Sequence, residues 1–250
     1  MDFFDLTIIF FVALLGGAFG SMIGGTSILT IPTLILLGLP PHTAIGTDRF
    51  GIIGIGLAGW YKFQKKGLIN YRIAWTIAIP IFVGSIIGSN MVLQINEEIL
   101  KKIIVGTNII MTVFILLNPR IGIEKRDTGI RRREYAIGIL LCLVVGIYGG
   151  FYGAVSGTFV LYILVLWFKQ TFIQSAANRM MGSVFMTVTA ATIFALNHAV
   201  DFYLGAAMLA GCLIGAYVGV HYMERIGDVW VKRLFFLFMV FVIVKMIVSH

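Results

Sequence analysis

The sequence has little charge and few of the residues that build the sites of soluble enzymes. Charged residues make up 12% of its 250 residues and hydrophobic residues 59%, whereas a soluble domain has about 25% charged residues. Its two cysteines, Cys142 and Cys212, lie in apolar runs without metal-site or CxxC spacing, so we expect them to be packing residues. No GxxxxGK[ST], HExxH or GxSxG motif is present. We therefore predict a protein that is not an enzyme or an ATP-driven pump, with no catalytic residues, metal or cofactor.

A basic N-terminal region and a large polar domain are also lacking. Residues 1–5 carry two acids and no base, unlike the start of a signal peptide. The net charge of +8 comes mainly from Lys and Arg in short loops between apolar runs, as in cytoplasmic loops of membrane proteins. Since no polar stretch is large enough to read a nucleic acid, the expected partners are the lipid bilayer and a small anion. The sequence predicts a multi-pass protein of the cytoplasmic (inner) membrane and leaves its oligomeric state open.

What the sequence does have is two groups of apolar runs, several of which reach the 18 residues or so that cross a bilayer. The runs cover residues 6–39, 43–61, 73–95, 99–118, 135–168, 176–200, 202–222 and 229–249. We expect an all-α polytopic membrane protein of two homologous repeats with about four helices each. The first transmembrane repeat is predicted over 1–118, a basic cytoplasmic linker over 119–134 and the second repeat over 135–250.

The two groups resemble each other at a constant offset of 132 residues. The matched residues of the first group and their partners are Gly17, Gly25, Thr26 and Ala44 with Gly149, Gly157, Thr158 and Ala176. With small gaps, "TDRF" at 47–50 falls near "ANRM" at 177–180, and "GLINY" at 67–71 near "HAVDF" at 198–202. These matches indicate a duplication. Internal repeats of this kind are typical of secondary transporters, whose sites form where the repeats meet.

The distribution of Lys and Arg favours repeats of opposite orientation. If every run crosses the membrane once, the loops on the two sides hold 11 and 6 of them, leaving out Arg49 and Arg179. If the runs 6–39 and 135–168 each turn back at a glycine break, the numbers become 14 inside and 3 outside. The positive-inside rule therefore favours inverted repeats with a broken or re-entrant first segment. A single long tilted helix is the alternative for each of these runs.

The breaks are "GGTS" at 24–27 and "VSGT" at 155–158. Irregular backbone inside a membrane is tolerated where it is buried in protein or lines a wet cavity. If a half-helix starts after each break, Thr26 or Ser27 and Ser156 or Thr158 can be its N-cap, and the free N–H groups suit an anion. The predicted anion cradle comprises Gly24, Gly25, Thr26, Ser27, Ser156, Gly157 and Thr158. The alternative is packing, because many glycines recur every four residues and would let helices approach closely.

Charged residues at the starts of the following runs are the second indication of a site. Asp48 and Arg49 follow Thr47, and Arg179 follows Asn178. Arginine presents a planar fork of donors that suits oxyanions, so both arginines are candidate counter-charges, with Thr47 and Asn178 as candidate substrate contacts. Asp48 is the candidate proton carrier or the charge partner of an arginine. The alternative is that these side chains lie at the membrane interface and snorkel.

Two further stretches carry a family resemblance. These are "GGAFGSMIGGTSILTIPTLILLGLPPHTAIGTD" at 16–48 and "GIYGGFYGAVSGTFVLYILVLWF" at 146–168. The chain resembles the TauE/SafE family of sulfite exporters, also described as 4-toluene sulfonate uptake permeases. The resemblance implies an eight-span protein of two four-helix halves that moves sulfur-containing anions. It points to Gly24, Gly25, Thr26 and Thr47 in the first motif, and to Gly157 and Thr158 in the second.

We therefore expect a proton-coupled secondary transporter for a small sulfur-containing oxyanion, sulfite or an organosulfonate, bound between the two breaks. One alternative is an anion channel with the same cradle and a continuous pore. Another is a membrane thiol oxidoreductase that uses Cys142 and Cys212. Asn70 and Asp201 occupy equivalent turns and are expected to cap the helices that follow them.

Overall fold

The computed structural model describes residues 3–22, 24–117 and 132–222, which are almost entirely helical and contain no strand. The helices are α1 (Phe3–Met22), α2 (Ser27–Leu36), α3 (Pro41–Gly51), α4 (Ile53–Lys65), α5 (Tyr71–Val92), α6 (Glu97–Leu117), α7 (Arg132–Phe151), α8 (Ser156–Leu166), α9 (Phe172–Leu196) and α10 (Phe202–Tyr222). In this part of the chain, α1, α5, α7, α9 and α10 are long and apolar enough to cross a membrane. The all-α membrane fold predicted from the composition is confirmed. Most of the predicted linker and the last apolar run, 229–249, lie outside the described residues.

Both predicted helix breaks are present, but the second lies three residues earlier than predicted, at 152–155, so that Ser156, Gly157 and Thr158 belong to α8. Gly24 and Gly25 have positive φ angles of 99° and 95° between α1 and α2. In the second half, Gly153 and Val155 have φ angles of 73° and 64° between α7 and α8. A positive φ lies outside the range of a right-handed helix, so each pair of positive values ends one helix and redirects the chain. The single long helix considered for each run is therefore wrong.

Of the predicted N-caps of the two short helices, Thr26 is confirmed by its position, Ser156 and Thr158 are wrong, and neither helix has a side-chain cap hydrogen bond. Thr26 stands at the N-cap position of α2, but its hydroxyl donates 2.8 Å to Gly16 O and makes no cap hydrogen bond. The N-cap of α8 is Val155, and the Ser156 hydroxyl donates back 2.7 Å to Gly153 O. The Thr26 hydroxyl instead holds the start of α2 to α1, and the Ser156 hydroxyl holds the start of α8 to the turn before it.

The run predicted over 43–61 is not one helix. It is interrupted at Ile52, where α3 ends and α4 begins. Glycines are frequent in this run and are weak helix formers. At Gly51 and Gly54 an added Cβ would collide with α10, at the Met208 side chain and at Leu209 O. The interruption and the missing side chains let α3 and α4 follow the surface of α10 closely.

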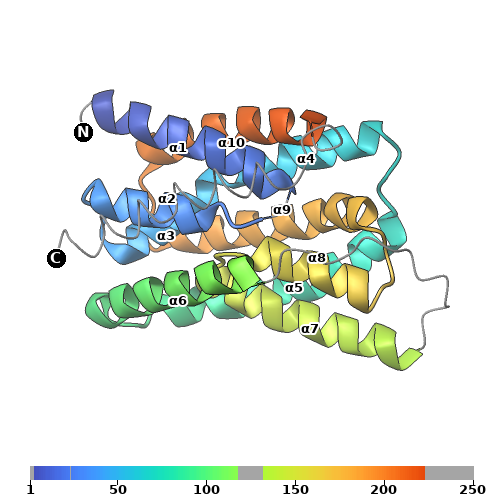
Figure 1. The fold of residues 1–250 in the computed structure, drawn as a ribbon. Coiled ribbons are helices and arrows are strands. Elements are labelled where there is room, and N and C mark those ends of the chain that lie inside the picture. Colours follow the sequence, from blue (N-terminus) through green and yellow to red (C-terminus); the bar gives the residue numbers. More distant parts are fainter. Residues whose placement is uncertain (1–2, 23, 118–131, 223–250) are drawn as a thin grey trace.

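The helices form two outer groups with a middle group between them (Figure 1). In that view α1, α4 and α10 lie along the top, α5, α6 and α7 along the bottom, and α9 between them with α2, α3 and α8. Residues 27–34 of α2 are buried. A helix too short to cross a bilayer must have its ends covered by protein, because lipid cannot satisfy its free backbone groups. The fold therefore places both helix breaks in its interior.

Glycines at four-residue spacing hold the two outer helix pairs together. Gly211 and Gly215 of α10 lie against the backbone carbonyls of α1, and Gly84 and Gly88 of α5 lie against those of α7. A Cβ at any of the four would collide with the facing backbone. The packing interpretation of these glycines is confirmed.

The packing of α1 on α10 and of α7 on α5 is reciprocal between the halves. The predicted repeat relates α1 to α7 and α5 to α10, so each first helix packs on the other half. The predicted caps are equivalent in the two halves. Asn70 accepts hydrogen bonds from two amides of α5, and Asp201 from two amides of α10. The inversion of the repeats across the membrane stays a prediction.

Candidate functional site

The two helix breaks meet inside the molecule. A Cβ on Gly24 would lie 2.8 Å from both the backbone nitrogen and the hydroxyl of Thr158, and one on Gly157 would lie 3.7 Å from Gly24 Cα. Glycine at 24 is therefore required both by its positive φ and by its close approach to the Thr158 backbone. The segments that the sequence predicted as one cradle, 24–27 and 155–158, are brought together by the fold.

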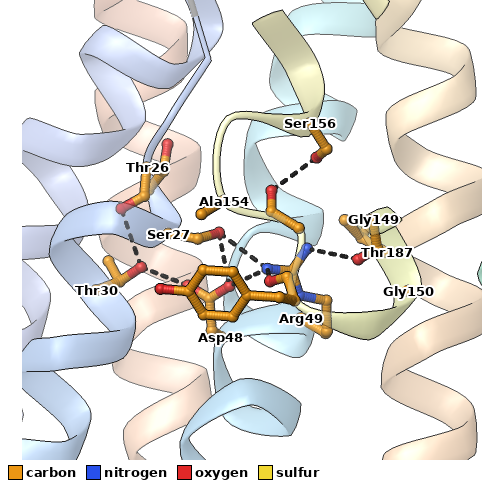
Figure 2. A network of polar contacts seen from close by, with 12 residues as sticks. Thr26, Ser27, Thr30, Asp48, Arg49, Gly149, Gly150, Ala154, Ser156 and Thr187 are labelled. Atoms are coloured by element: carbon orange, nitrogen blue, oxygen red, sulfur yellow. Dashed lines mark hydrogen bonds and ion pairs between the residues drawn. The ribbon is translucent and has the colours of Figure 1, made fainter. Parts of the chain in front are cut away.

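Arg49, fully buried, lies at the end of α7 (Figure 2). Its Nη2 donates 2.8 Å to Tyr152 O, 2.8 Å to Asp48 Oδ2 and 2.9 Å to Ser27 Oγ. Its Nη1 donates to Gly149 O at 3.4 Å. The last carbonyls of a helix have no partner within the helix and carry partial negative charge, so a cation is stabilised there. Arg49 of the first half thus caps a helix of the second half.

Asp48 neutralises Arg49 within the same network. Its carboxylate is fully buried and accepts hydrogen bonds from Arg49 Nη2, from Ser27 Oγ at 2.8 Å and from Thr30 Oγ1. Ser27 both donates to the carboxylate and accepts from the guanidinium. A buried ion pair is tolerated when further hydrogen bonds satisfy its lone pairs and protons. Here they satisfy both carboxylate oxygens and both terminal nitrogens of the guanidinium, but not Arg49 Nε.

Arg179 of the second half makes the corresponding contact with the end of α1 in the first half. It is 3% exposed, and its Nη2 donates 2.9 Å to Gly20 O and 2.8 Å to Ser21 O at the end of α1. Tyr152, whose carbonyl Arg49 holds, lies 132 residues after Gly20, the same offset that relates Gly25 to Gly157. The snorkelling interpretation of both arginines is therefore wrong.

The surroundings of Arg179 differ from those of Arg49 in one respect. Among the described residues, no carboxylate forms an ion pair with Arg179. Its Nε is buried without a hydrogen-bond partner, as is Nε of Arg49. Its Nη1 lies so close to Gly157 that a Cβ there would be 2.6 Å away. Within the described residues, Arg179 is thus a buried cation held by the carbonyl dipoles of Gly20 and Ser21.

The start of α8 adds a hydrogen-bond donor beside Arg179. The amides of Ser156, Thr158 and Phe159 donate to carbonyls of the preceding turn, at 3.1, 2.8 and 3.2 Å. Within the described part of the chain, the amide of Gly157 has no such acceptor. A free amide at a helix N-terminus and an arginine without a counter-ion are both groups that bind oxyanions.

Two predicted contact residues, Thr47 and Asn178, make hydrogen bonds to turns of the protein. Thr47 Oγ1 accepts from Asp201 N at 2.9 Å. Asn178 Oδ1 accepts from Asn70 N at 2.7 Å, and its Nδ2 donates 3.1 Å to Gln170 Oε1. Both side chains are buried and hold the turns that precede α5 and α10. These hydrogen bonds give both side chains a structural role, and their predicted contact with a substrate stays a prediction.

Sequence reasoning missed several members of the site. Thr30 follows Thr26 and Ser27 by one helical turn, so the spacing could have placed its hydroxyl on the same face of α2. The carbonyls of Gly20, Ser21 and Tyr152 left no signal, because every residue carries a carbonyl and only the fold decides which arginine reaches it.

The two cysteines lie in different apolar clusters. Cys142 of α7 packs with side chains such as Ile81 and Val160, and Cys212 of α10 packs with Ile9 and Met208. Both are buried and carry free thiols. This supports the packing role expected for the two cysteines. No observation in the described residues supports the oxidoreductase alternative.

Comparison with known proteins gives one family. The family model described as "Sulfite exporter TauE/SafE" matches residues 9–246. A probable membrane transporter protein of Haemophilus influenzae is 27% identical over 91% of this chain and 88% of its own length. The probable membrane transporter protein YfcA of Escherichia coli is 28% identical over 86% and 79%, and YdhB of Bacillus subtilis is 24% identical over 93% and 94%. No solved structure matches the chain. The chain belongs to the TauE/SafE family of membrane transporters and is a multi-pass membrane protein.

Proposed function

We propose that this protein is a secondary transporter that moves a small sulfur-containing oxyanion, sulfite or an organosulfonate, across the cytoplasmic membrane. The observation that carries the proposal is Arg179, a buried cation without a carboxylate partner among the described residues, set against the glycines where the two breaks meet. The description of the matching family, a sulfite exporter, supports the chemical class of the anion.

In this proposal the anion binds beside Arg179 and the amide of Gly157. Its oxygens accept hydrogen bonds from the guanidinium Nε and from the α8 amide, which have no other acceptor in the described part of the chain. Glycines at 24 and 157 let the two backbones approach, so the anion can contact both halves. Charge-assisted hydrogen bonds inside a protein are roughly twice as strong as neutral ones, which offsets part of the cost of removing the anion from water.

Transport then requires the two halves to move against each other. Arg49 and Arg179 each link one half to the broken first helix of the other. Rocking of one repeat would therefore change both contacts together, as alternating access in repeat transporters demands. Asp48, the one carboxylate that is fully buried among the described residues, is the proposed proton site.

The first experiment is a thermal-shift screen of the purified protein with sulfite, sulfate, methanesulfonate, nitrate and acetate. A ligand that binds the folded state raises the melting temperature by mass action. We expect a shift with sulfite or the sulfonate that is lost in Arg179→Ala and retained in Lys102→Ala, a control that removes an exposed lysine paired with Glu98. No shift with any anion would contradict the proposal.

An anion channel would share the same cradle, and uptake into proteoliposomes separates it from a transporter. A transporter loaded inside with unlabelled anion accelerates uptake of labelled anion, and its rate saturates. Uptake that rises linearly with concentration and shows no acceleration would indicate a channel.

A further inference from the structure

The two arginines hold equivalent carbonyls but differ in what balances their charge. Arg49 has Asp48 beside it, at 2.8 Å. The residue that precedes Arg179 is Asn178, which carries no charge and turns toward Asn70 and Gln170. The carboxylate of Asp48 thus balances the charge of Arg49. Within the described residues, no carboxylate balances the charge of Arg179.

The Asp48 carboxylate sits in a complete receptor for an oxyanion. Its oxygens accept from one guanidinium and from two hydroxyls, those of Ser27 and Thr30 (Figure 2). A carboxylate and a sulfonate or sulfite ion present the same chemistry to such donors: oxygens that share a negative charge and accept hydrogen bonds. The donors that would bind a transported anion at Arg49 are therefore already assembled, and Asp48 occupies them.

We propose that Asp48 is a built-in competitor of the transported anion for Arg49, and that the anion reaches Arg49 only when Asp48 takes up a proton. Before the exchange the pair is a guanidinium and a carboxylate. Afterwards the guanidinium faces the anion, and Asp48 is a neutral carboxylic acid. One proton and one monovalent anion enter together, so the net charge of the site does not change. This inference rests on the proposed function and supplies its coupling step.

The neighbours of Asp48 make it the group that can take the proton. Among the described residues, the other titratable groups that interact with it are Arg49 on its own helix, Tyr152 just after α7 and Cys212 of α10, with Tyr148 of α7 facing Arg49. Helix α2 contributes only the hydroxyls of the receptor. Tyrosine and cysteine are ordinarily neutral near pH 7, and arginine keeps its charge. Asp48 is thus the one negative group in this set, and a proton on it removes the competitor.

The test compares the wild type with Asp48→Asn, in which an amide of the same shape replaces the carboxylate. The probe is methanesulfonate, because its charge does not change over the pH range used. In the wild type we expect the binding at Arg49 to weaken by up to tenfold per pH unit between about pH 5 and about pH 8, because each anion bound there takes up one proton. Asp48→Asn should bind methanesulfonate more tightly than the wild type at the higher pH and show no such dependence.

A double variant, Asp48→Asn with Arg49→Gln, is the control for the charge of the site. It leaves a neutral pair in place of the ion pair, so the extra affinity of Asp48→Asn should disappear. If Asp48→Asn fails to fold, proton uptake by the wild type is measured directly with a pH-indicator dye in unbuffered solution. Added methanesulfonate should then cause proton uptake in the wild type and none in the double variant.

The possible results separate this inference from the proposed function. Anion binding that needs Arg179 but is independent of pH and unaccompanied by proton uptake would overturn the role of Asp48 and leave the proposed function standing. The same pH dependence in the wild type and in Asp48→Asn would also overturn it. If neither methanesulfonate nor sulfite binds the wild type or Asp48→Asn, the proposed function fails and this inference fails with it.

Discussion

Arg49 and Arg179 occupy corresponding places in the two halves and hold corresponding carbonyls, yet their electrostatic surroundings are opposite. Arg49 belongs to a network with its own carboxylate and two hydroxyls. Arg179 has carbonyl oxygens on one nitrogen and a glycine against another. A buried charge is expensive unless it is compensated. The comparison suggests that the first half supplies this compensation itself, whereas the second half leaves it to an anion from outside.

The largest expected effect is on stability, when Asp48 is removed. Asp48→Ala leaves the Arg49 guanidinium buried without its partner, a change that typically costs about 3–5 kcal/mol. Its counterpart Asn178→Ala removes neutral hydrogen bonds and leaves Asn70 N–H unsatisfied, which costs about 1–3 kcal/mol. The free energy of unfolding in detergent, measured for both variants, checks the difference. Equal losses would show that the two halves are electrostatically alike.

The next effect is on anion affinity, when Arg179 loses its charge. Arg179→Gln removes a charge-assisted interaction of about 1.5–3 kcal/mol, which corresponds to binding that is roughly 10- to 150-fold weaker. Lys102→Gln, which removes the same charge from an exposed pair, should leave affinity unchanged. Calorimetric titration with sulfite or methanesulfonate measures both. Unaltered affinity in Arg179→Gln would remove this arginine from the site.

Adding a methyl group at Gly153, which faces Arg49, and at Gly157, which faces Arg179, should separate the roles of the two arginines. Gly153→Ala places a Cβ in the left-handed region and against Arg49 Nη1, so strain adds to an overpacking cost of about 1–3 kcal/mol. Gly157→Ala crowds Arg179 Nη1 as well, but it gains about 1 kcal/mol of helix propensity. We expect Gly153→Ala to lose more stability and Gly157→Ala to lose more anion affinity. Melting temperatures with and without anion give both readouts, and the reverse order would contradict the assignment of the anion to Arg179.

The smallest expected effect concerns single hydroxyls. Ser27→Ala removes one donor to Asp48 and one acceptor from Arg49, and it should cost about 1–3 kcal/mol because both partners are charged. Ser156→Ala removes one bond to Gly153 O and should cost about 0.5–1.5 kcal/mol. Thermal unfolding of the two variants side by side measures the difference. A larger loss for Ser156→Ala would mean that the Asp48 network is weaker than its geometry indicates.

Several features of this protein could be predicted from its residues. Long apolar runs predicted membrane helices, and doubled small and hydroxyl residues predicted both breaks. Asn70 and Asp201 were identified as caps from their place before an apolar run, since capping depends on residues within one turn. Glycines at four-residue spacing predicted close helix pairs. All of these depend on local geometry or on one helix face, which sequence spacing specifies directly.

Other predictions failed because they depended on contacts between distant segments. The hydroxyls of Thr26 and Ser156 were expected to cap their helices, but the first bonds to a carbonyl of α1 and the second to a carbonyl of the turn before α8. Thr47 and Asn178, predicted to contact substrate, each hold a turn of the opposite half, a role that the sequence did not indicate. In each case the side chain has several possible acceptors, and the tertiary arrangement selects one of them.

By itself the sequence determined that the chain enters a membrane, that each half begins with a broken helix, and that two arginines and one aspartate follow the breaks. It could do so because hydrophobicity, helix breaking and charge are properties of residues and their near neighbours. Only the tertiary structure decided that each arginine crosses to the other half, and that Asp48 compensates Arg49 while no described carboxylate compensates Arg179. The two arginines differ because different buried groups lie within about 3 Å of their charges. These distances are set by packing between segments more than 100 residues apart.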